Sequence, residues 1–297
     1  MIRAIGPYQL VRRLGRGGMA EVHLAIAHGA SGFERHVAIK LLAPELAGEP
    51  ELERALIREA TLAGTLHHRN LVAALGLGVH DGSYYVVMEY VDGTDLARHL
   101  DGPVPEPLAL HIVHELAVGL AYLHAATDAR GLPLGIVHRD VGPANVLVST
   151  TGDIKLGDFG IAKATALADL TAAGARKGRY SYMAPEQLAS EPVTVAADQF
   201  GLGVTLVELV TGQRPFAGET PWALLEAIRG GPQLAGISVL APDLAAIAAR
   251  TLAFDARDRY PSVDDARRAI AEAQRQRAPA TAIELGDWVR ARLTAGG

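Results

Sequence analysis

The sequence contains no cysteine among its 297 residues. Disulfides, thiolate metal sites and cysteine nucleophiles are therefore excluded, and a chain without thiols suits a reducing cytoplasm. An excess of basic charge is also missing, because the formal net charge is −5. General binders of nucleic acid or of anionic membrane surfaces need a basic surface, so the composition argues against both classes.

Long hydrophobic runs are absent as well. The first ten residues lack the apolar core of a signal peptide. The longest apolar stretches, at residues 108–123 and 200–210, are too short or carry charged residues, whereas a spanning helix needs roughly 20 apolar residues in succession. We therefore expect a soluble, cytoplasmic chain without a membrane span. Apolar residues still form 49% of the sequence, enough for the core of one large domain or two small ones.

Local patterns divide the chain into a strand-rich part and a helix-rich part. The first ninety residues contain short apolar segments and one stretch with helical spacing, which predicts about five strands and one helix. From Leu96 onward most segments have helical spacing. The expected strands are Tyr8–Leu14, Glu21–Ala27, His36–Leu41, Leu71–Val79 and Tyr84–Tyr90, and the expected helices are Glu51–Leu66, Pro107–Ala126, Val193–Thr211, Pro221–Gly230, Asp243–Thr251 and Val263–Gln276.

The sequence around the last of these helices gives two further signals. Pro261-Ser262 predicts a cap at its start. After it, residues 277–280 read as a linker, and an apolar stripe at helical spacing predicts a short final helix. The members of the stripe are Leu285, Trp288, Val289 and Leu293.

Residues His138–Asn145 read HRDVGPAN, and Asp158-Phe159-Gly160 follows. Aspartate and asparagine are common in loops because they favour turns, but that explains one such residue and not several in this order. Phosphoryl transfer from ATP requires a carboxylate that orients the attacking hydroxyl group and oxygen ligands for magnesium on the phosphates. With these two motifs the chain resembles the protein kinases, and more narrowly the eukaryotic-like Ser/Thr kinases of bacteria.

The resemblance covers about residues 8–276 and implies a fold. We expect an α+β, bilobal protein-kinase fold, with a small antiparallel β lobe that contains one key helix and a larger, mainly helical lobe. The expected divisions are residues 1–92 for the nucleotide-binding lobe, 93–276 for the helical lobe with the catalytic loop and activation segment, and 277–297 for the tail. A short polar break at residues 91–94 is the expected hinge.

The resemblance also implies roles for the two motifs. Asp140 would be the catalytic base, and Asn145 and Asp158 would be the magnesium ligands. Arg139 would bind a phosphate on the activation segment, because a guanidinium group matches phosphate geometry. His138 would pack inside the catalytic loop and would not be a general base.

Residues Leu14–Val22 resemble the kinase glycine-rich loop, in which backbone N–H groups approach the phosphates without an intervening Cβ. Ala20 replaces the third glycine of the pattern, and taken alone an ordinary glycine-rich hairpin turn explains the segment equally well. Residues 88–91 match the hinge that bonds the adenine edge. The residues that the resemblance assigns to the nucleotide are Leu14, Gly15, Gly17, Gly18, Val22, Ala38, Lys40, Glu89, Val91, Asp95 and Leu147.

Lys40 could also be interpreted as an ordinary surface lysine with no role in nucleotide binding. Glu59 argues against this interpretation, because its carboxylate shares an apolar helical face with Leu56 and Ala63. A carboxylate that faces a core needs a partner, since leaving it unpaired costs several kcal/mol. We predict an ion pair between Lys40 and Glu59; in the kinase family this pair holds the α- and β-phosphates.

The resemblance extends to scaffold residues further along the chain. Ala184-Pro185-Glu186 closes the activation segment, Glu186 would pair with Arg259, and Asp198 would accept N–H bonds from the catalytic loop. Small-molecule kinases of related fold lack this segment, so these residues favour a protein kinase. The histidines at 67–68 and at 111 and 114 have no third ligand at a suitable spacing and are interpreted as structural.

Two positions depart from the family pattern. Gly142 stands where Ser/Thr kinases typically have a lysine that contacts the γ-phosphate. Arg179 stands where they have a threonine that links the activation segment to the catalytic aspartate. Because the catalytic and metal residues themselves are retained, we favour an active but slower enzyme. A pseudokinase that acts as a nucleotide-binding scaffold and a small-molecule phosphotransferase remain as alternatives.

The leading hypothesis is a kinase that uses ATP and Mg²⁺ to phosphorylate Ser/Thr hydroxyls of protein substrates, including its own. A dimer would allow one chain to phosphorylate another. We also expect activation by phosphorylation between residues 160 and 184, where a new phosphate would bond to Arg139. The available hydroxyls are those of Thr165, Thr171 and Ser181, with Thr171 preferred because it lies in the middle of the segment.

Overall fold

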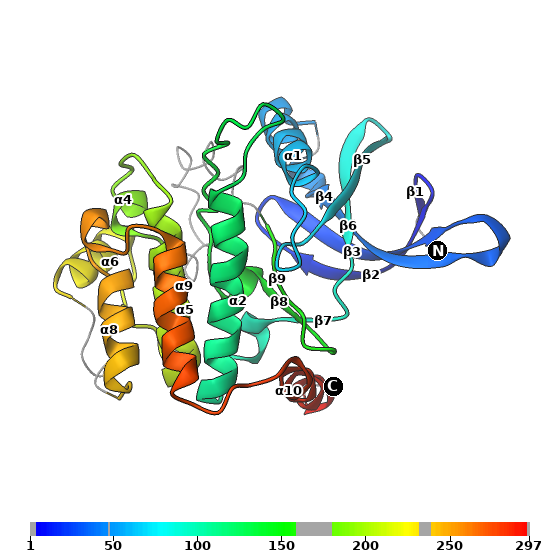
Figure 1. The fold of residues 1–297 in the computed structure, drawn as a ribbon. Coiled ribbons are helices and arrows are strands. Elements are labelled where there is room, and N and C mark those ends of the chain that lie inside the picture. The colour runs from blue at the N-terminus through cyan, green and yellow to red at the C-terminus, as the bar shows by residue number, and fades with distance from the viewer. Residues whose placement is uncertain (1–3, 47, 159–179, 232–238, 296–297) are drawn as a thin grey trace. The chain divides into compact units, whose positions relative to one another are not determined.

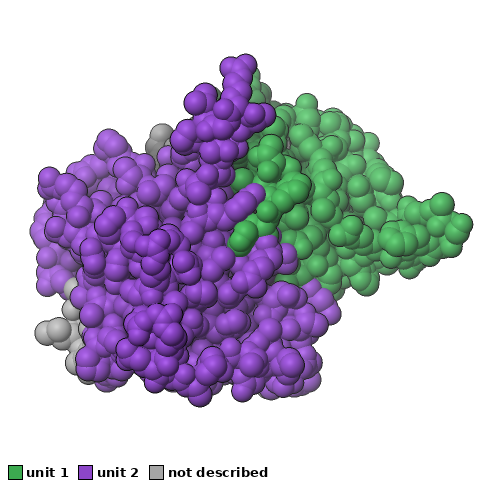
Figure 2. Space-filling model, viewed as in Figure 1, with its two compact units in different colours: residues 1–68, 72–91, 159–175 green, residues 69–71, 92–158, 176–297 purple. Residues whose placement is uncertain are grey.

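The structure is a computed structural model that describes residues 4–46, 48–158, 180–231 and 239–295. The chain forms two compact units, coloured separately in Figure 2. The first contains the described residues among 4–68 and 72–91, and the second contains residues 69–71, 92–158 and the described residues from 180 onward. The chain passes into the second unit after Val91, one residue before the expected boundary.

The first unit is built on a six-stranded antiparallel sheet with the strand order β1-β2-β3-β4-β6-β5 (Figure 1). Alternate side chains of its strands point into one apolar cluster, which includes Ala25, Val37 and Ile39. The first strand was not expected, because two residues are too few to show a periodic pattern. The strands are β1 (Ala4–Ile5), β2 (Tyr8–Arg16), β3 (Ala20–His28), β4 (Glu34–Leu42), β5 (Ala74–His80) and β6 (Ser83–Glu89).

Helix α1 (Pro50–Ala63) packs against β5 and β6. It begins with a proline, which is favoured at the first helical position because its missing N–H group has no partner to lose there. On the side that faces the sheet, Leu56 and Ala60 contact Val86 of β6. Glu59 is buried on this helix as well, as the apolar spacing predicted.

The second unit contains a three-stranded antiparallel sheet, which we call the small sheet: β7 (Gly93–Asp95), β8 (Val146–Ser149) and β9 (Ile154–Leu156). The break expected at residues 91–94 is therefore partly a strand. Glycine is required at position 93, because a Cβ there would overlap the backbone carbonyl group of Val148.

The segment Arg69–Leu71 joins this second unit, although the chain on both sides of it belongs to the first. Leu71 forms a parallel bridge with Leu156 of β9, and the Leu156 N–H group donates to the carbonyl oxygen of Asn70 at 2.8 Å. The Asn70 side chain donates to the carbonyl oxygen of Ile154 and to the carboxylate of Glu115, each at 3.0 Å. These bonds fix three residues from between α1 and β5 on the small sheet.

Helices α2 (Glu106–His124) and α5 (Ala196–Thr211) form the buried centre of the second unit, with α9 beside α2 and α8 beside α5 (Figure 1). Both are apolar on nearly all sides, which fits helices that neighbours cover. The expected cap of α9 is present, since the Ser262 hydroxyl oxygen accepts the Asp265 N–H group at 3.1 Å. The other helices are α4 (Pro185–Leu188), α6 (Pro221–Arg229), α8 (Pro242–Thr251), α9 (Val263–Arg275) and α10 (Ala282–Ala295).

Residues 277–280 connect α9 to α10, as expected, and the short final helix is present. Two details differ from the expectation. Arg277 does more than connect the helices, because its guanidinium group bonds to Asp243 at 2.6 and 3.0 Å and also to Glu106. It therefore fixes the end of α9 to the first turns of α8 and α2. Leu293 is not in the buried stripe of α10, since it is 39% exposed. Among the described helices, none is both long and apolar enough to cross a membrane.

Candidate active site

The glycine-rich loop joins β2 to β3 in the first unit. Gly15 on β2 pairs with Val22 on β3, and the Gly17 N–H group donates to the carbonyl oxygen of Ala20 at 2.8 Å, which closes the turn. A Cβ built on Gly18 would meet no described atom within 4 Å. Backbone groups at this turn are thus accessible, as phosphate binding by a glycine loop requires.

Lys40 and Glu59 form the predicted ion pair, with Nζ 2.6 Å from Oε1. The lysine is on β4 and the glutamate on α1, and their exposed fractions are 9% and 8%. Lys40 also pairs with Val22 across β3 and β4, which places it close to the glycine-rich loop. A buried ion pair is a weak source of stability, because desolvation offsets the attraction. A role in positioning the ammonium group explains its presence better.

Two candidate nucleotide residues have structural partners of their own. The Glu89 carboxylate accepts the Ala73 N–H group at 2.7 Å. A contact between Glu89 and adenine would therefore use the backbone groups of Glu89 and not its side chain. In the second unit, Asp95 caps a short 3₁₀ turn by accepting the Arg98 N–H group at 3.2 Å, and burial raises its pKa. Asp95 also pairs with Leu147 across β7 and β8, so these two nucleotide candidates are neighbours on the small sheet.

The catalytic loop of the second unit folds around Asp140 and Asn145. The Asn145 amide nitrogen donates to the backbone oxygen of Asp140 at 2.6 Å and to its carboxylate oxygen Oδ2 at 2.5 Å. Because both amide hydrogens are directed at Asp140, the amide oxygen is the arm that points away from it. Asn145 thereby fixes the candidate base and presents an oxygen ligand.

Asp158 follows β9 and is connected to the same loop through Gly157. The Gly157 N–H group donates to the carbonyl oxygen of Asn145 at 2.9 Å, and the Gly157 carbonyl oxygen lies 3.1 Å from Nε2 of His138. His138 is fully buried, which confirms that it packs inside the loop. The hydrogen bonds thus bring the chain at Asp158 next to Asn145.

An amide oxygen and a carboxylate are hard oxygen ligands, and such ligands fit a divalent cation that also takes oxygens from phosphates or water. No cluster of three or more His, Asp or Glu side chains in the described chain could hold a metal by itself. Asn145 and Asp158 can supply two such oxygens, and a cation held by them would take its remaining oxygens from phosphates or water.

Asp198, in the first turn of α5, anchors the catalytic loop as predicted. Its carboxylate accepts the N–H groups of His138 and Arg139 at 2.8 and 2.7 Å, and His124 Nε2 lies 2.7 Å from it. Arg139 has φ of 67°, a left-handed conformation that is uncommon for a residue with a side chain. The Gln187 side chain holds the Arg139 carbonyl oxygen at 2.9 Å, so both sides of this strained residue are bonded.

The backbone conformation at position 142 does not require glycine, because φ is 177° and any residue adopts such an extended conformation. Its neighbour is the ring of Tyr182, since a Cβ on Gly142 would lie 3.0 Å from Cγ of that tyrosine. The size of a side chain at position 142 is thus limited by the Tyr182 ring, at the end of the activation segment, and not by the backbone of the catalytic loop.

Tyr182 belongs to a polar network that the sequence analysis missed. Its hydroxyl donates to Glu208 at 2.5 Å, and burial raises the pKa of both groups. Arg214 Nε lies 3.5 Å from the same carboxylate, and its guanidinium group donates to the Ser181 hydroxyl at 2.8 Å. Neither Glu208 nor Arg214 is in a recognisable motif. A glutamate inside an apolar helix was the available signal.

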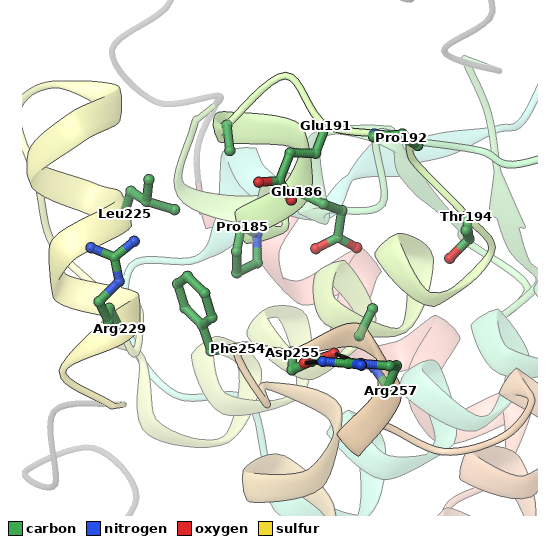
Figure 3. A pocket seen from close by; sticks show the side chains of 12 residues that line it. Pro185, Glu186, Glu191, Pro192, Thr194, Leu225, Arg229, Phe254, Asp255 and Arg257 are labelled. Atoms are coloured by element: carbon green, nitrogen blue, oxygen red, sulfur yellow. Dashed lines mark hydrogen bonds and ion pairs between the residues drawn. The ribbon is translucent and has the colours of Figure 1, made fainter.

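Glu186 and Arg259 form the predicted pair, with two parallel bonds of 2.8 and 2.9 Å, and Arg259 is 2% exposed. A cavity of about 380 Å³ opens beside Glu186 (Figure 3). Its lining contains none of the candidate catalytic, nucleotide or metal residues, so it is separate from the candidate active site. Among the lining residues are Pro185, Glu186, Leu225, Arg229, Phe254 and Arg257.

Several residues named from the sequence lie outside the described part of the chain. They include the second and third members of the Asp158-Phe159-Gly160 motif, two of the three candidate phosphorylation sites and one departure from the family pattern. These residues are Phe159, Gly160, Thr165, Thr171 and Arg179.

Comparison with known proteins gives consistent matches. The protein kinase domain family matches residues 8–261. The tyrosine-protein kinase MasK of Myxococcus xanthus is 42% identical over 89% of this chain and 42% of its own length. The serine/threonine-protein kinase PknB of Mycobacterium leprae is 35% identical over 98% of this chain and 46% of its own length. The serine/threonine-protein kinase PrkC of Bacillus subtilis is 39% identical over 73% of this chain and 32% of its own length. The chain thus spans less than half the length of these relatives.

Solved structures agree with the sequence matches. The crystal structure of the Mycobacterium tuberculosis PknI kinase domain has a TM-score of 0.66 and 32% identity, and the match covers 91% of this chain and 97% of that one. The expected fold class, with a small antiparallel sheet and a larger helical part, is therefore confirmed. Because the relatives bear the names of kinases, the comparisons give no support to the pseudokinase alternative.

Proposed function

Because the chain belongs to the protein kinase family, we propose that it transfers the γ-phosphoryl group of ATP to Ser/Thr hydroxyls of proteins, its own included. The observation that carries this proposal is the bonding of the catalytic loop: Asn145 holds the Asp140 carboxylate, and Gly157, next to Asp158, donates to Asn145. Phosphoryl transfer depends on positioning and charge neutralisation, and these bonds supply the positioning.

Each polar group then has a distinct task. The Asp140 carboxylate, oriented by Asn145, accepts and orients the acceptor hydroxyl group. The Lys40 ammonium group, held by Glu59, binds phosphate oxygens. We propose Mg²⁺ as the metal, with the Asn145 amide oxygen and the Asp158 carboxylate as its protein ligands. When bound, the cation neutralises charge on the phosphates.

The acceptor class is the part of this proposal that most needs a direct test. Two relatives are named serine/threonine-protein kinases and one is named a tyrosine-protein kinase. Gly142 replaces the lysine that is typical of Ser/Thr kinases. The Ser/Thr assignment is supported by the majority of these names, whereas the scaffold pair Glu186–Arg259 supports a protein acceptor of either hydroxyl class.

We further propose activation by phosphorylation after Gly160, with the phosphate bound by Arg139. Thr171 remains the first choice, and a dimer is a direct way for one chain to modify another. The chain would act in the cytoplasm, which the absence of cysteine supports.

The deciding experiment incubates the pure protein with labelled ATP, with and without Mg²⁺, and maps the modified residues by mass spectrometry. We expect metal-dependent phosphate on serine or threonine, and transfer slower by roughly 10²–10⁴ in the Asp140→Asn variant. Phosphate on tyrosine alone would overturn the acceptor class. A wild-type protein that binds ATP but transfers nothing to itself or to generic protein substrates would overturn the proposed activity.

A further inference from the structure

Helix α10 lies beyond residues 8–261, which the family match covers. Its start is fixed locally, because the Thr281 hydroxyl oxygen accepts the Glu284 N–H group at 3.2 Å and the Glu284 carboxylate accepts the Thr281 N–H group at 2.8 Å. Such a reciprocal capping box stabilises a helix start without help from the rest of the fold. The helix is therefore an ordered element and not a frayed extension.

One face of α10 is buried against the small sheet. Leu285 and Val289 are fully buried and Trp288 is 9% exposed, whereas Ile283 on another face is 73% exposed. The helix contacts β7 and β8, and Figure 1 shows it beside β7. The guanidinium group of Arg292 covers the Trp288 ring at 3.9 Å from its centroid, so this large apolar side chain is held by packing and by a cation–π contact.

The backbone of α10 lies very close to the backbone of the turn between β8 and β9. A Cβ on Gly286 would lie 2.7 Å from the carbonyl oxygen of Thr150, and a Cβ on Gly152 would overlap the carbonyl oxygen of Ala282. The Arg290 guanidinium group donates to that same Thr150 carbonyl oxygen. Two glycines and one arginine thus permit an approach that larger residues would prevent.

Thr150 connects this contact to the nucleotide candidates. Its carbonyl oxygen binds Arg290, and its N–H group donates to the carbonyl oxygen of Asp92 at 2.7 Å, at the point where the chain enters the second unit. The strand before it carries Leu147, which pairs with Asp95. A movement of Thr150 would therefore be transmitted to both strands that carry the adenine and ribose candidates of this unit.

We propose that α10 is a positioning helix for the nucleotide: its docking on the small sheet holds β7 and β8 in the geometry that binds ATP. The proposal rests on the proposed function, because it assumes that nucleotide contacts these strands. Arg290 and Gly286 act through Thr150 and do not touch the nucleotide. If docking of α10 increases the affinity for nucleotide by some factor, bound nucleotide must increase the equilibrium constant for docking by the same factor, because such coupling is reciprocal.

The chain carries its own reporter of docking. It has two tryptophans, Trp288 in the contact and Trp222, which is 68% exposed on α6. In a Trp222→Phe background, acrylamide quenching of the remaining fluorescence measures how far Trp288 is covered. Nucleotide affinity is measured in parallel by calorimetry with ADP and Mg²⁺.

Gly286→Val and Arg290→Ala weaken the contact, and Ala291→Val is the matched control, since it adds the same kind of side chain at an exposed position of the same helix. We expect the Kd for ADP to rise about fivefold or more in the first two variants and to stay unchanged in the control. Saturating ADP should lower the quenching of Trp288 in the Trp222→Phe protein.

Three results separate the explanations. If Trp288 becomes accessible in Gly286→Val or Arg290→Ala while the Kd for ADP stays at the wild-type value, the positioning role is refuted. If ADP binds the starting protein but leaves Trp288 quenching unchanged, the reciprocal coupling is refuted. A starting protein that binds no ADP would refute the proposed function itself. Should Gly286→Val fail to fold, Arg290→Ala decides, because its side chain is about half exposed.

Discussion

Two residues of the catalytic motifs, Arg139 and Asp158, have left-handed backbone conformations with φ of 67° and 55°. Such a conformation costs on the order of 1–3 kcal/mol for a residue with a side chain and persists only where the surroundings impose it. At Arg139 the surroundings are the Asp198 carboxylate and the Gln187 amide. The residues next to Asp140 are therefore held in place by α5 and α4 rather than by local preference.

Asp140→Asn tests the role of the positioned carboxylate. The variant keeps the shape of the side chain but removes its ability to accept the proton of the acceptor hydroxyl, so we expect kcat to fall by roughly 10²–10⁴. The affinity for ADP should stay the same, because the proposed phosphate contacts come from Lys40 and the metal ligands. Steady-state kinetics and calorimetry give the two values. A wild-type kcat in this variant would contradict the assignment.

Gly142→Lys tests whether the missing lysine limits the rate. The extended backbone accepts a side chain, but the Tyr182 ring must yield by a few tenths of an ångström. If it does, a cation near the γ-phosphate should raise kcat by roughly tenfold with little change in ATP affinity, because phosphoryl charge is redistributed in the transition state.

Gly142→Ala is the control for this substitution, since it introduces the same Cβ without the ammonium group. A kcat that falls equally in both variants would show that the contact with Tyr182 outweighs any gain from charge. A lysine variant that folds, binds ATP normally and gains nothing would show that another group already fills the role.

At the scale of elements, α2 carries a buried carboxylate that makes stability depend on pH. Burial alone would raise the pKa of Glu115, but hydrogen bonds from His114 and Asn70 and the charge of Arg69 lower it from 4.5 to about 2. In the unfolded chain the Glu115 carboxylate takes up a proton near pH 4.5, whereas in the native chain it takes up a proton only near pH 2. The resulting stabilisation is complete above pH 4.5 and is lost as the pH falls toward 2.

Glu115→Gln should remove this dependence. Between pH 5 and pH 3 the free energy of unfolding of the wild type should fall by on the order of 2 kcal/mol more than that of the variant. Urea unfolding at several pH values measures both curves. Glu51→Gln, an exposed position on α1, is the control and should follow the wild type. Parallel curves for wild type and Glu115→Gln would refute the contribution of this carboxylate.

How far the elements can be predicted from sequence depends on their length. Helices such as α2 and α5 were predicted to within about three residues at each end, because long stretches rich in apolar residues mark them. Strands β1 and β7 have two and three residues, and such lengths show no period. The pair Lys40–Glu59 was predictable from one charge on an apolar face, whereas the partners of Tyr182 depend on tertiary packing alone.

At the scale of the whole molecule, Glu186 and Arg259 join segments that are 73 residues apart. Arg259 also donates to the carbonyl oxygens of Ala196 and Ala253. Arg259→Met should therefore lower the free energy of unfolding by about 3–5 kcal/mol, because it leaves a buried carboxylate without its partner. Glu186→Gln should cost less, since the amide oxygen still accepts one bond.

Urea unfolding of both variants checks this order. The control is Arg257→Met, because Arg257 is 89% exposed and pairs with Asp255 at the surface. A loss in Arg259→Met no larger than in Arg257→Met would contradict the long-range role of the buried pair.

The assignment of Arg69–Leu71 to the second unit has a consequence for recombining kinases. A chimera that joins residues 1–91 of one parent to residues 92–297 of another inherits this segment from the wrong parent. It would place a foreign side chain opposite Glu115 and a foreign backbone beside Leu156. A chimera that keeps these contacts takes residues 69–71 from the parent that supplies residues 92–158, so within residues 48–158 the two units are separated by three junctions and not by one.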